Sequence, residues 1–289
     1  MGRMAAAFWS VTAVAVLFAL LASNVLPQRE APSSAAARSS VPWLQILLLT
    51  LAVISVSLGS TSSSAVNNFV GIVMAVFLAV VLMRIESRAK QTLLPSGALR
   101  LRSRLAALYG LMSLLVVMIT SGEVFVPLFL QVLHQQSPLA AGYLAALMAA
   151  GWTLGSLVGS GFSGRAVDRA LMSGPARGGV GMIGLALRVP AAGSGTWLQM
   201  VPICVALAVI GIGVGLAWPH LLTRVLTSAP PEEQERAGAL ITTIQLFATA
   251  AGAALAGMVA NAAGLIEPGG AEGTARAARW LFATFALAP

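Results

Sequence analysis

The residue in this sequence best suited to chemistry is Glu123, an acid near the middle of the apolar stretch 105–133. That stretch is long enough to cross a membrane, and a charged side chain at mid-membrane costs about 2.5–3.5 kcal/mol on insertion scales. Such an acid normally faces a cavity or a partner, where its carboxyl group can exchange a proton or hold a cation. Gly122 and Pro127 flank it and favour a locally loosened helix. The competing interpretation is structural: a protonated carboxyl group that hydrogen-bonds a neighbouring helix.

A second set of polar side chains lies in the stretch 237–266, on an Ala- and Gly-rich background. Thr242, Gln245 and Thr249 are spaced i, i+3, i+7 and so share one face of a helix. They could line a polar passage, or they could only bond neighbouring helices, which contributes about 0.6 kcal/mol for each bond. Gln131, near the end of the Glu123 stretch, is a weaker candidate of the same kind.

Gly151, Gly155 and Gly159 form a doubled G-x-x-x-G pattern in the stretch 139–162. Small residues at this spacing let two helix backbones approach closely in a membrane. We expect a static packing face, with a sliding contact between moving helices as the alternative.

Directly after that stretch, Gly164, Asp168 and Arg169 form the pattern G-x-x-x-D-R. Gly164 permits a tight turn. Asp168 can pair with a basic residue or with a helix N-terminus across the loop. Taken alone, this short pattern is a weak signal.

The composition excludes a soluble globular domain. Charged residues make up 9% of the chain and the types AVILMFWYC 58%, whereas soluble domains carry about 25% charged residues. The net charge of +8 does not indicate nucleic-acid binding, because the basic residues are dispersed among loops and form no continuous patch.

We expect neither an enzyme nor a metal or cofactor site. The sequence contains no H-E-x-x-H, no G-x-S-x-G and no pair of acids within one apolar stretch. Its two His residues are far apart, with no acidic cluster near either. The single Cys204 lies in an apolar run and is expected to be a packed thiol.

The apolar stretches predict an all-α fold, a polytopic transmembrane helical bundle. About eight stretches are candidates for full spans, and a partial ninth ends the chain: 4–26, 43–58, 66–83, 105–133, 139–162, 178–189, 197–222, 237–266 and 279–289. The stretch 178–189 is the weakest of them, because it is short and rich in Gly.

Basic residues crowd into alternate gaps between these stretches. Thirteen of the 17 Lys and Arg fall in residues 27–42, 84–104, 163–177 and 223–236. In multispanning proteins the basic loops lie on the cytoplasmic side. The pattern predicts that these four segments are cytoplasmic loops of a multi-pass protein of the cell (plasma) membrane, with the N-terminus outside.

Several motifs, in their order along the chain, resemble the fourteen-helix drug:proton antiporters of the major facilitator superfamily. The resemblance rests on G-x-x-x-D-R at 164–169 and on three further runs: 127–131 followed by Ser137-Pro138 and Gly142; 86–88 followed by Leu94-Pro95; and Ala237-Gly238 followed by Gln245, Gly252 and Gly257. The G-x-x-x-D-R loop departs from the family's pattern after Arg169, where Ala170-Leu-Met-Ser replaces a Gly and basic residues.

This resemblance implies two six-helix bundles with an extra helix pair between them. Residues 1–26 would be the last helix of the N-terminal bundle, 27–42 a cytoplasmic linker, 43–83 the extra pair, 84–104 a basic cytoplasmic loop and 105–289 a truncated C-terminal bundle. Because the last apolar run is too short to cross, we expect the chain to be a piece of a longer protein. The resemblance implies that the N-terminal bundle is missing from it.

The resemblance also implies secondary transport, in which proton entry drives export of a small amphipathic drug or metabolite by alternating access. The expected partners are then that substrate, a proton and the lipid bilayer. The implied proton and substrate site comprises Glu123, Gln245, Thr242, Thr249 and Gln131, and the implied cytoplasmic gate comprises Gly164, Asp168 and Arg169. The alternative is a truncated membrane protein that inserts but does not transport alone.

Overall fold

The computed structural model describes residues 9, 12–21, 43–60, 64–86, 88 and 103–288. All regular elements in these residues are helical, which confirms the predicted all-α class. Thr12–Leu21 is a short apolar helix in a unit of its own, Met1–Val41, and the other helices belong to a second unit, Pro42–Pro289. The expected linker 27–42 and most of the expected loop 84–104 lie outside the described residues.

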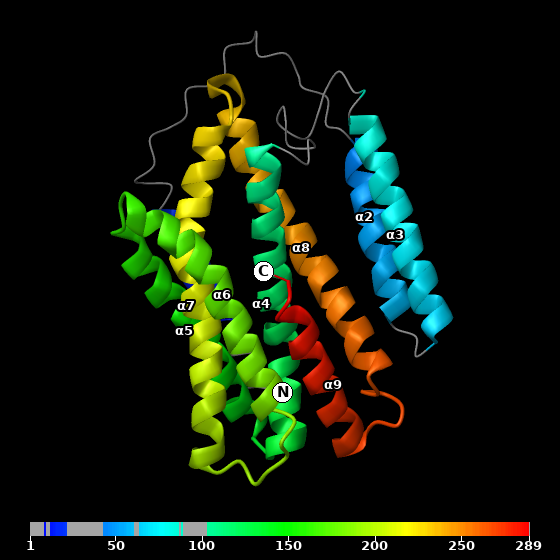
Figure 1. Cartoon of the computed structure of the whole chain (residues 1–289). Helices are drawn as coiled ribbons and strands as arrows, with labels where there is room; N and C mark the ends of the chain where they lie inside the picture. Colours follow the sequence, from blue (N-terminus) through cyan, green and yellow to red (C-terminus); the bar gives the residue numbers. More distant parts are fainter. Residues whose placement is uncertain are drawn as a thin grey trace. The chain divides into compact units, whose positions relative to one another are not determined.

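The described part of the second unit is built from α-helices (Figure 1). In chain order they are α2 (Trp43–Ser60), α3 (Ala65–Glu86), α4 (Arg104–His134), α5 (Pro138–Ser160), α6 (Arg165–Arg188), α7 (Trp197–Ser228), α8 (Gln234–Ala262) and α9 (Gly270–Phe285), with a 3-10 turn η1 (Pro231–Glu233) before α8.

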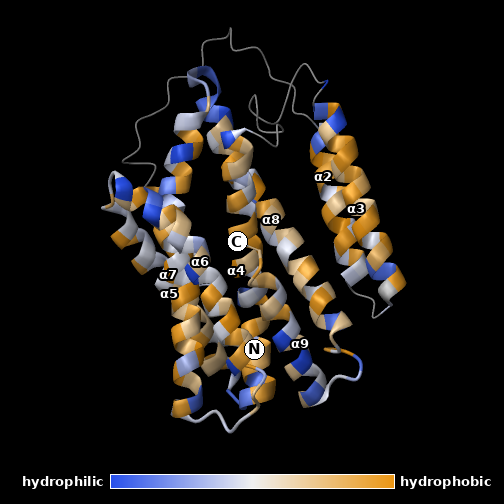
Figure 2. Ribbon diagram, viewed as in Figure 1, coloured by the Kyte–Doolittle hydropathy of each residue, from blue (hydrophilic) through white to orange (hydrophobic). Residues whose placement is uncertain are grey.

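Six helical segments of the described residues are long and apolar enough to cross a membrane: α2, α3, α4, α5, α7 and η1 with α8. Figure 2 shows hydrophobic residues along the length of α2 and α3, with hydrophilic residues gathered toward the helix ends. Helices α6 and α9 fall outside this set. They contain most of the expected spans 178–189 and 279–289, but both helices begin well before those stretches.

The expected loop 163–177 is mostly helix, because α6 runs without interruption from Arg165 to Arg188. Pro175 and the neighbouring glycines resemble helix breakers in the sequence. In the structure Gly174 and Pro175 are buried, and a Cβ on Gly174 would stand 2.5 Å from the carbonyl oxygen of Gly213 in α7. Close packing against α7 stabilises the helix through the residue that lacks an N–H. Segment 178–189 is therefore the second half of α6 and no separate span.

Helix α9 begins at Gly270 rather than near residue 279. Glu272, Arg276 and Arg279 are exposed on one of its faces, while Ala277 and Leu281 are among the buried residues of the other. Those charges interrupt the apolar run, although the helical period continues through them. Helix α7 also continues past Pro219 to Ser228, which shortens the expected loop 223–236 to the connection before α8.

Helices α4 to α9 pack around one apolar core, in which Phe129 of α4 meets Phe282 of α9 edge-on with ring centroids 5.6 Å apart. Helices α4 and α8 run side by side in the same direction. Tyr109 Oη donates to the Ala237 carbonyl at 3.0 Å, and farther along both helices Gly252 lies against Val117. This pairing sets the relative depth of the polar residues that α4 and α8 carry.

Helices α2 and α3 form a hairpin beside α8. A Cβ on Gly71 of α3 would stand 2.6 Å from the Ser55 carbonyl oxygen and 3.2 Å from the Gly59 Cα of α2. The hairpin also contacts α8, because Asn261 Nδ2 donates to the Ser60 carbonyl at 2.6 Å. Because α2 and α3 are antiparallel and meet where Gly71 packs against Ser55 and Gly59, the first turn of α2 lies level with the last turn of α3.

Candidate functional site

Glu123 lies in the middle of α4, and its side chain is exposed on the surface of the described bundle. The preceding Gly122 faces the interior, where a Cβ would stand 3.3 Å from the Met148 methyl carbon of α5. Among the described residues, no hydrogen bond or ion pair reaches the Glu123 carboxylate. Since a charge exposed to lipid tails is costly, this face of α4 needs water or further protein against it in the membrane.

Pro127 changes the backbone at Glu123 itself. In a regular helix the N–H of residue 127 would bond the carbonyl of residue 123, but proline has no N–H and its ring pushes that carbonyl aside. The Glu123 main chain and side chain therefore both offer oxygen acceptors at one depth. One turn farther on, Gln131 Nε2 donates to the Pro127 carbonyl at 3.0 Å, so this predicted site residue bonds within its own helix.

The predicted polar row on α8 lies at the surface of the bundle. Thr242 and Thr249 are exposed and Gln245 is half-buried. Thr243 is on another face, where its hydroxyl donates to the Ala239 carbonyl at 3.3 Å. The side chains of Thr242, Gln245 and Thr249 can therefore contact a ligand that lies against the outer surface of the described bundle.

Glu123 and the α8 row do not form one pocket. Gly252 of α8 touches α4 at Val117 and Thr120. The α8 row precedes this crossing, whereas Glu123 follows it on a parallel helix. At 1.5 Å per residue, Glu123 is separated along the helix axes by about 12 Å from Thr249 and about 18 Å from Gln245. The two groups would meet a substrate at different depths in the membrane.

The G-x-x-x-G face of α5 lies against α7. A Cβ on Gly151, Gly155 or Gly159 would stand 2.5, 2.6 or 2.9 Å from a carbonyl oxygen of α7. On α7, a Cβ on Gly211 or Gly215 would in turn stand 2.0 or 2.2 Å from a carbonyl oxygen of α5. Glycines thus interlock from both helices, a geometry of close backbone packing.

Gly164, Asp168 and Arg169 stand at the start of α6 rather than in an extended loop. Gly164 is the N-cap residue, with φ 54° and ψ −130°, a conformation that favours glycine. Asp168 lies in the first turn of α6 and forms an ion pair with Arg224 of α7. Arg169 is exposed. The sequence predicts that Asp168 pairs with a basic residue or with a helix N-terminus. In the structure its partner is a basic residue, Arg224, which is 56 residues away and carries no local pairing signal.

Both histidines contribute to helix-end packing. His220 Nε2 of α7 lies 2.9 Å from the Gly159 carbonyl oxygen at the end of α5, and its ring stacks on Phe162. At the opposite end of the bundle, His134 Nε2 lies 3.0 Å from the Val189 carbonyl oxygen. Within the part of the chain that the structure describes, no three His, Cys, Asp or Glu residues are grouped to hold a metal ion.

No protein-family model matches the chain. The chain is 31% identical over 281 residues to proteins named probable multidrug-efflux transporter from two strains of Mycobacterium tuberculosis, CDC 1551 / Oshkosh and H37Rv. Each alignment covers 96% of this chain and 57% of the relative, so the chain spans just over half the length of the curated relatives it matches. These names are those of transporters and not of enzymes. Taken with the six apolar helices, the similarity supports a multi-pass membrane protein that resembles proteins named as efflux transporters.

Proposed function

We propose that this chain is the C-terminal part of a secondary transporter that exports small amphipathic drugs or metabolites in exchange for protons. Two observations support this function. The relatives are named probable multidrug-efflux transporters, and the α2–α3 hairpin is followed by six helices, α4 to α9, around one core. That order agrees with the extra helix pair and C-terminal bundle of the fourteen-helix antiporters of the major facilitator superfamily.

The observation that carries the proposal is the exposed acid Glu123 at mid-span, next to a carbonyl freed by Pro127. An ionised carboxylate attracts the cationic part of an amphipathic compound, while a protonated one is neutral and tolerated in an apolar environment. A proton and a cationic substrate would therefore compete for Glu123. In this mechanism the entry of a proton releases the substrate, which is the chemistry of an exchanger.

The α8 row has a different role in this mechanism. Thr242, Gln245 and Thr249 lie about 12–23 Å from Glu123 along the helix axes, so they would contact a substrate on its path and not at the proton site. Gly164, Asp168 and Arg169 would belong to the cytoplasmic gate, since the Asp168–Arg224 pair joins the ends of α6 and α7. Rocking of this bundle against an N-terminal bundle would give alternating access.

The test is efflux of a fluorescent lipophilic cation from cells without other multidrug pumps, with the protein expressed from its complete reading frame. We expect Glu123→Gln to abolish efflux and its dependence on the proton gradient, while the amount of protein in the membrane is unchanged. Glu272→Gln, which neutralises an exposed acid on α9, is the matched control and should export normally.

Normal efflux by the Glu123→Gln variant would exclude Glu123 as the proton site. Correct insertion without efflux of any lipophilic cation by the unmodified protein would favour the alternative, a membrane protein that inserts but does not transport alone.

A further inference from the structure

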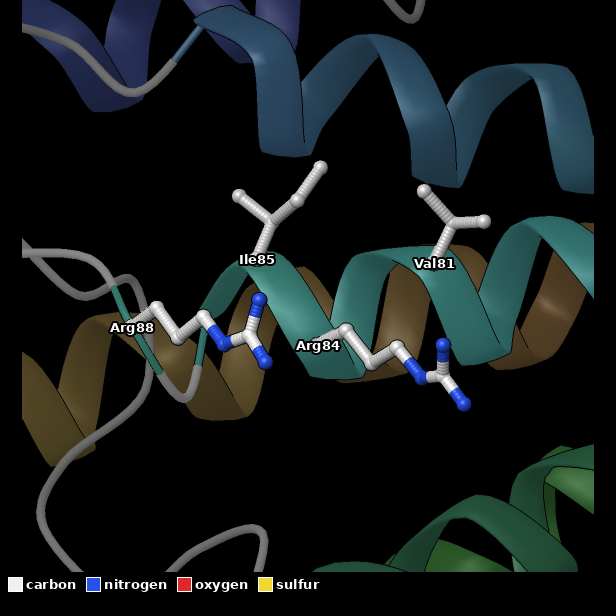
Figure 3. Close-up of a pocket in the computed structure, with 4 residues that line it drawn as sticks. All are labelled: Val81, Arg84, Ile85 and Arg88. Carbon is white, nitrogen blue, oxygen red and sulfur yellow. The ribbon is translucent and has the colours of Figure 1, made fainter.

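The charged residues at the end of α3 and just beyond it differ in exposure. Glu86 is 2% exposed and lines an apolar cavity of about 130 Å³ between α2, α3 and α8. Arg84, in the last turn of α3, and Arg88, two residues past the end of that helix, are both exposed. With Val81 and Ile85 they line a shallow surface hollow of about 380 Å³. Figure 3 shows Val81 and Ile85 pointing toward α2 and the two arginine side chains extending in the same direction along α3.

The two arginines terminate a long apolar stripe. Phe69, Val73, Phe77 and Val80 follow one another at intervals of three or four residues up to Arg84, and they are 38–67% exposed. Helix α3 is also the least covered of the membrane-length helices, with 11% of its apolar window buried. The stripe is an apolar surface as long as the helix, and it ends at two cationic side chains. Such a surface suits an amphiphile that has an apolar chain and an anionic head.

The arginine end lies at the depth of a membrane–water interface. Trp43, the first residue of α2, is 72% exposed, and the α2–α3 hairpin places it level with the last turn of α3. Exposed Trp residues mark the headgroup layer of membrane proteins. By the distribution of basic residues, this layer belongs to the cytoplasmic leaflet, where anionic lipids concentrate.

We propose that Arg84 and Arg88 bind the phosphate of an anionic phospholipid from the cytoplasmic leaflet, whose acyl chains lie along the α3 stripe. A guanidinium group presents paired N–H donors that match phosphate oxygens, and two of them that line one hollow can hold one headgroup. Val81 and Ile85 then contact the glycerol carbons in the hollow. This site does not depend on transport, so a test of it is separate from a test of the role of Glu123.

The test uses the 289-residue chain purified in an uncharged detergent, with lipid binding followed by native mass spectrometry. We expect saturable binding of phosphatidylglycerol, and binding of phosphatidylcholine that is at least about tenfold weaker. The variant Arg84→Gln with Arg88→Gln should lose that preference. The control variant Arg188→Gln with Arg279→Gln removes two exposed arginines elsewhere, with the same change in net charge, and should keep it.

Arg84→Lys with Arg88→Lys keeps the charge if the Gln variant fails to fold, and it should retain part of the preference because ammonium groups bind phosphate without the paired geometry. An unchanged preference in the folded Gln variant would overturn the proposal. So would an equal loss in the control, which would indicate a general charge effect. Competition by millimolar inorganic phosphate as strong as that by phosphatidylglycerol would identify a free-anion site and exclude the lipid.

Discussion

Asp168, in the first turn of α6, forms an ion pair with Arg224 near the end of α7, so the two helices are joined where one begins and the other ends. The side chains of Arg224 and Asp168 are 34% and 62% exposed. Exposed pairs of this kind contribute about 0–1 kcal/mol to folding stability. The pair is therefore too weak to account for the stability of the bundle, and its consequence is to bias the position of one helix end against the other.

Asp168→Asn should consequently separate function from stability. We expect it to lower the free energy of unfolding by less than about 1 kcal/mol, and to lower efflux at least about fivefold if the pair biases a gate. Efflux of a lipophilic cation and unfolding in mixed micelles measure the two effects. Exchanging the charges, Asp168→Arg with Arg224→Asp, should recover part of the efflux. A variant that unfolds easily and exports normally would assign the pair to stability alone.

Two glycines of α5 offer a matched test of backbone packing. A Cβ on Gly155 would stand 2.6 Å from the Ile212 carbonyl oxygen and 3.0 Å from its Cα, whereas a Cβ on Gly142 would have no atom within 4 Å. Gly155→Ala must force α5 away from α7, at a cost of about 1–3 kcal/mol. Gly142→Ala should be neutral or stabilising by up to about 1 kcal/mol, through helix propensity alone. Unfolding midpoints in mixed micelles compare them, and equal midpoints would contradict the packing role of Gly155.

The parts of the fold that follow from local apolar runs could be predicted from the sequence. The stretch 105–133 became α4 with nearly the same ends, because a long continuous run of apolar residues has few alternatives in a membrane. The course of α6 could not be predicted in the same way. Pro175 ends a helix by its own local chemistry, and close packing of α6 against α7, as at Gly174 and Gly181, opposes that preference.

The candidate site, too, could be predicted from the sequence only in part. Glu123 is identifiable from one acid in an apolar run, since the cost of its charge does not depend on knowing the neighbours. Its distance from Gln245 depends on how α4 and α8 pair, which the contact of Gly252 with Val117 determines. The sequence also offered no means to connect Asp168 with Arg224, because surface ion pairs across 56 residues have no periodic pattern.

Pro127→Ala tests whether the freed Glu123 carbonyl matters. The substitution restores an N–H that can bond this carbonyl, so α4 should become straighter and more stable while Glu123 stays in place. We expect weaker efflux of the lipophilic cation, with a smaller loss than for Glu123→Gln. Pro202→Ala on α7 removes a proline from a helix segment without an acid and should leave efflux unchanged. Full efflux by Pro127→Ala would restrict the role of Glu123 to its carboxyl group.

Cysteine labelling tests the orientation on which both the gate and the lipid site depend. Ala192, between α6 and α7, and Glu232, in η1, are exposed at opposite ends of the bundle. In a Cys204→Ala background, a membrane-impermeant maleimide should label Ala192→Cys on intact cells and Glu232→Cys only after permeabilisation, because basic loops stay in the cytoplasm. The reverse pattern would place Asp168 and Arg224 outside, together with Arg84 and Arg88. It would then remove the anionic inner leaflet as the source of the proposed lipid, even if Glu123 still supported efflux.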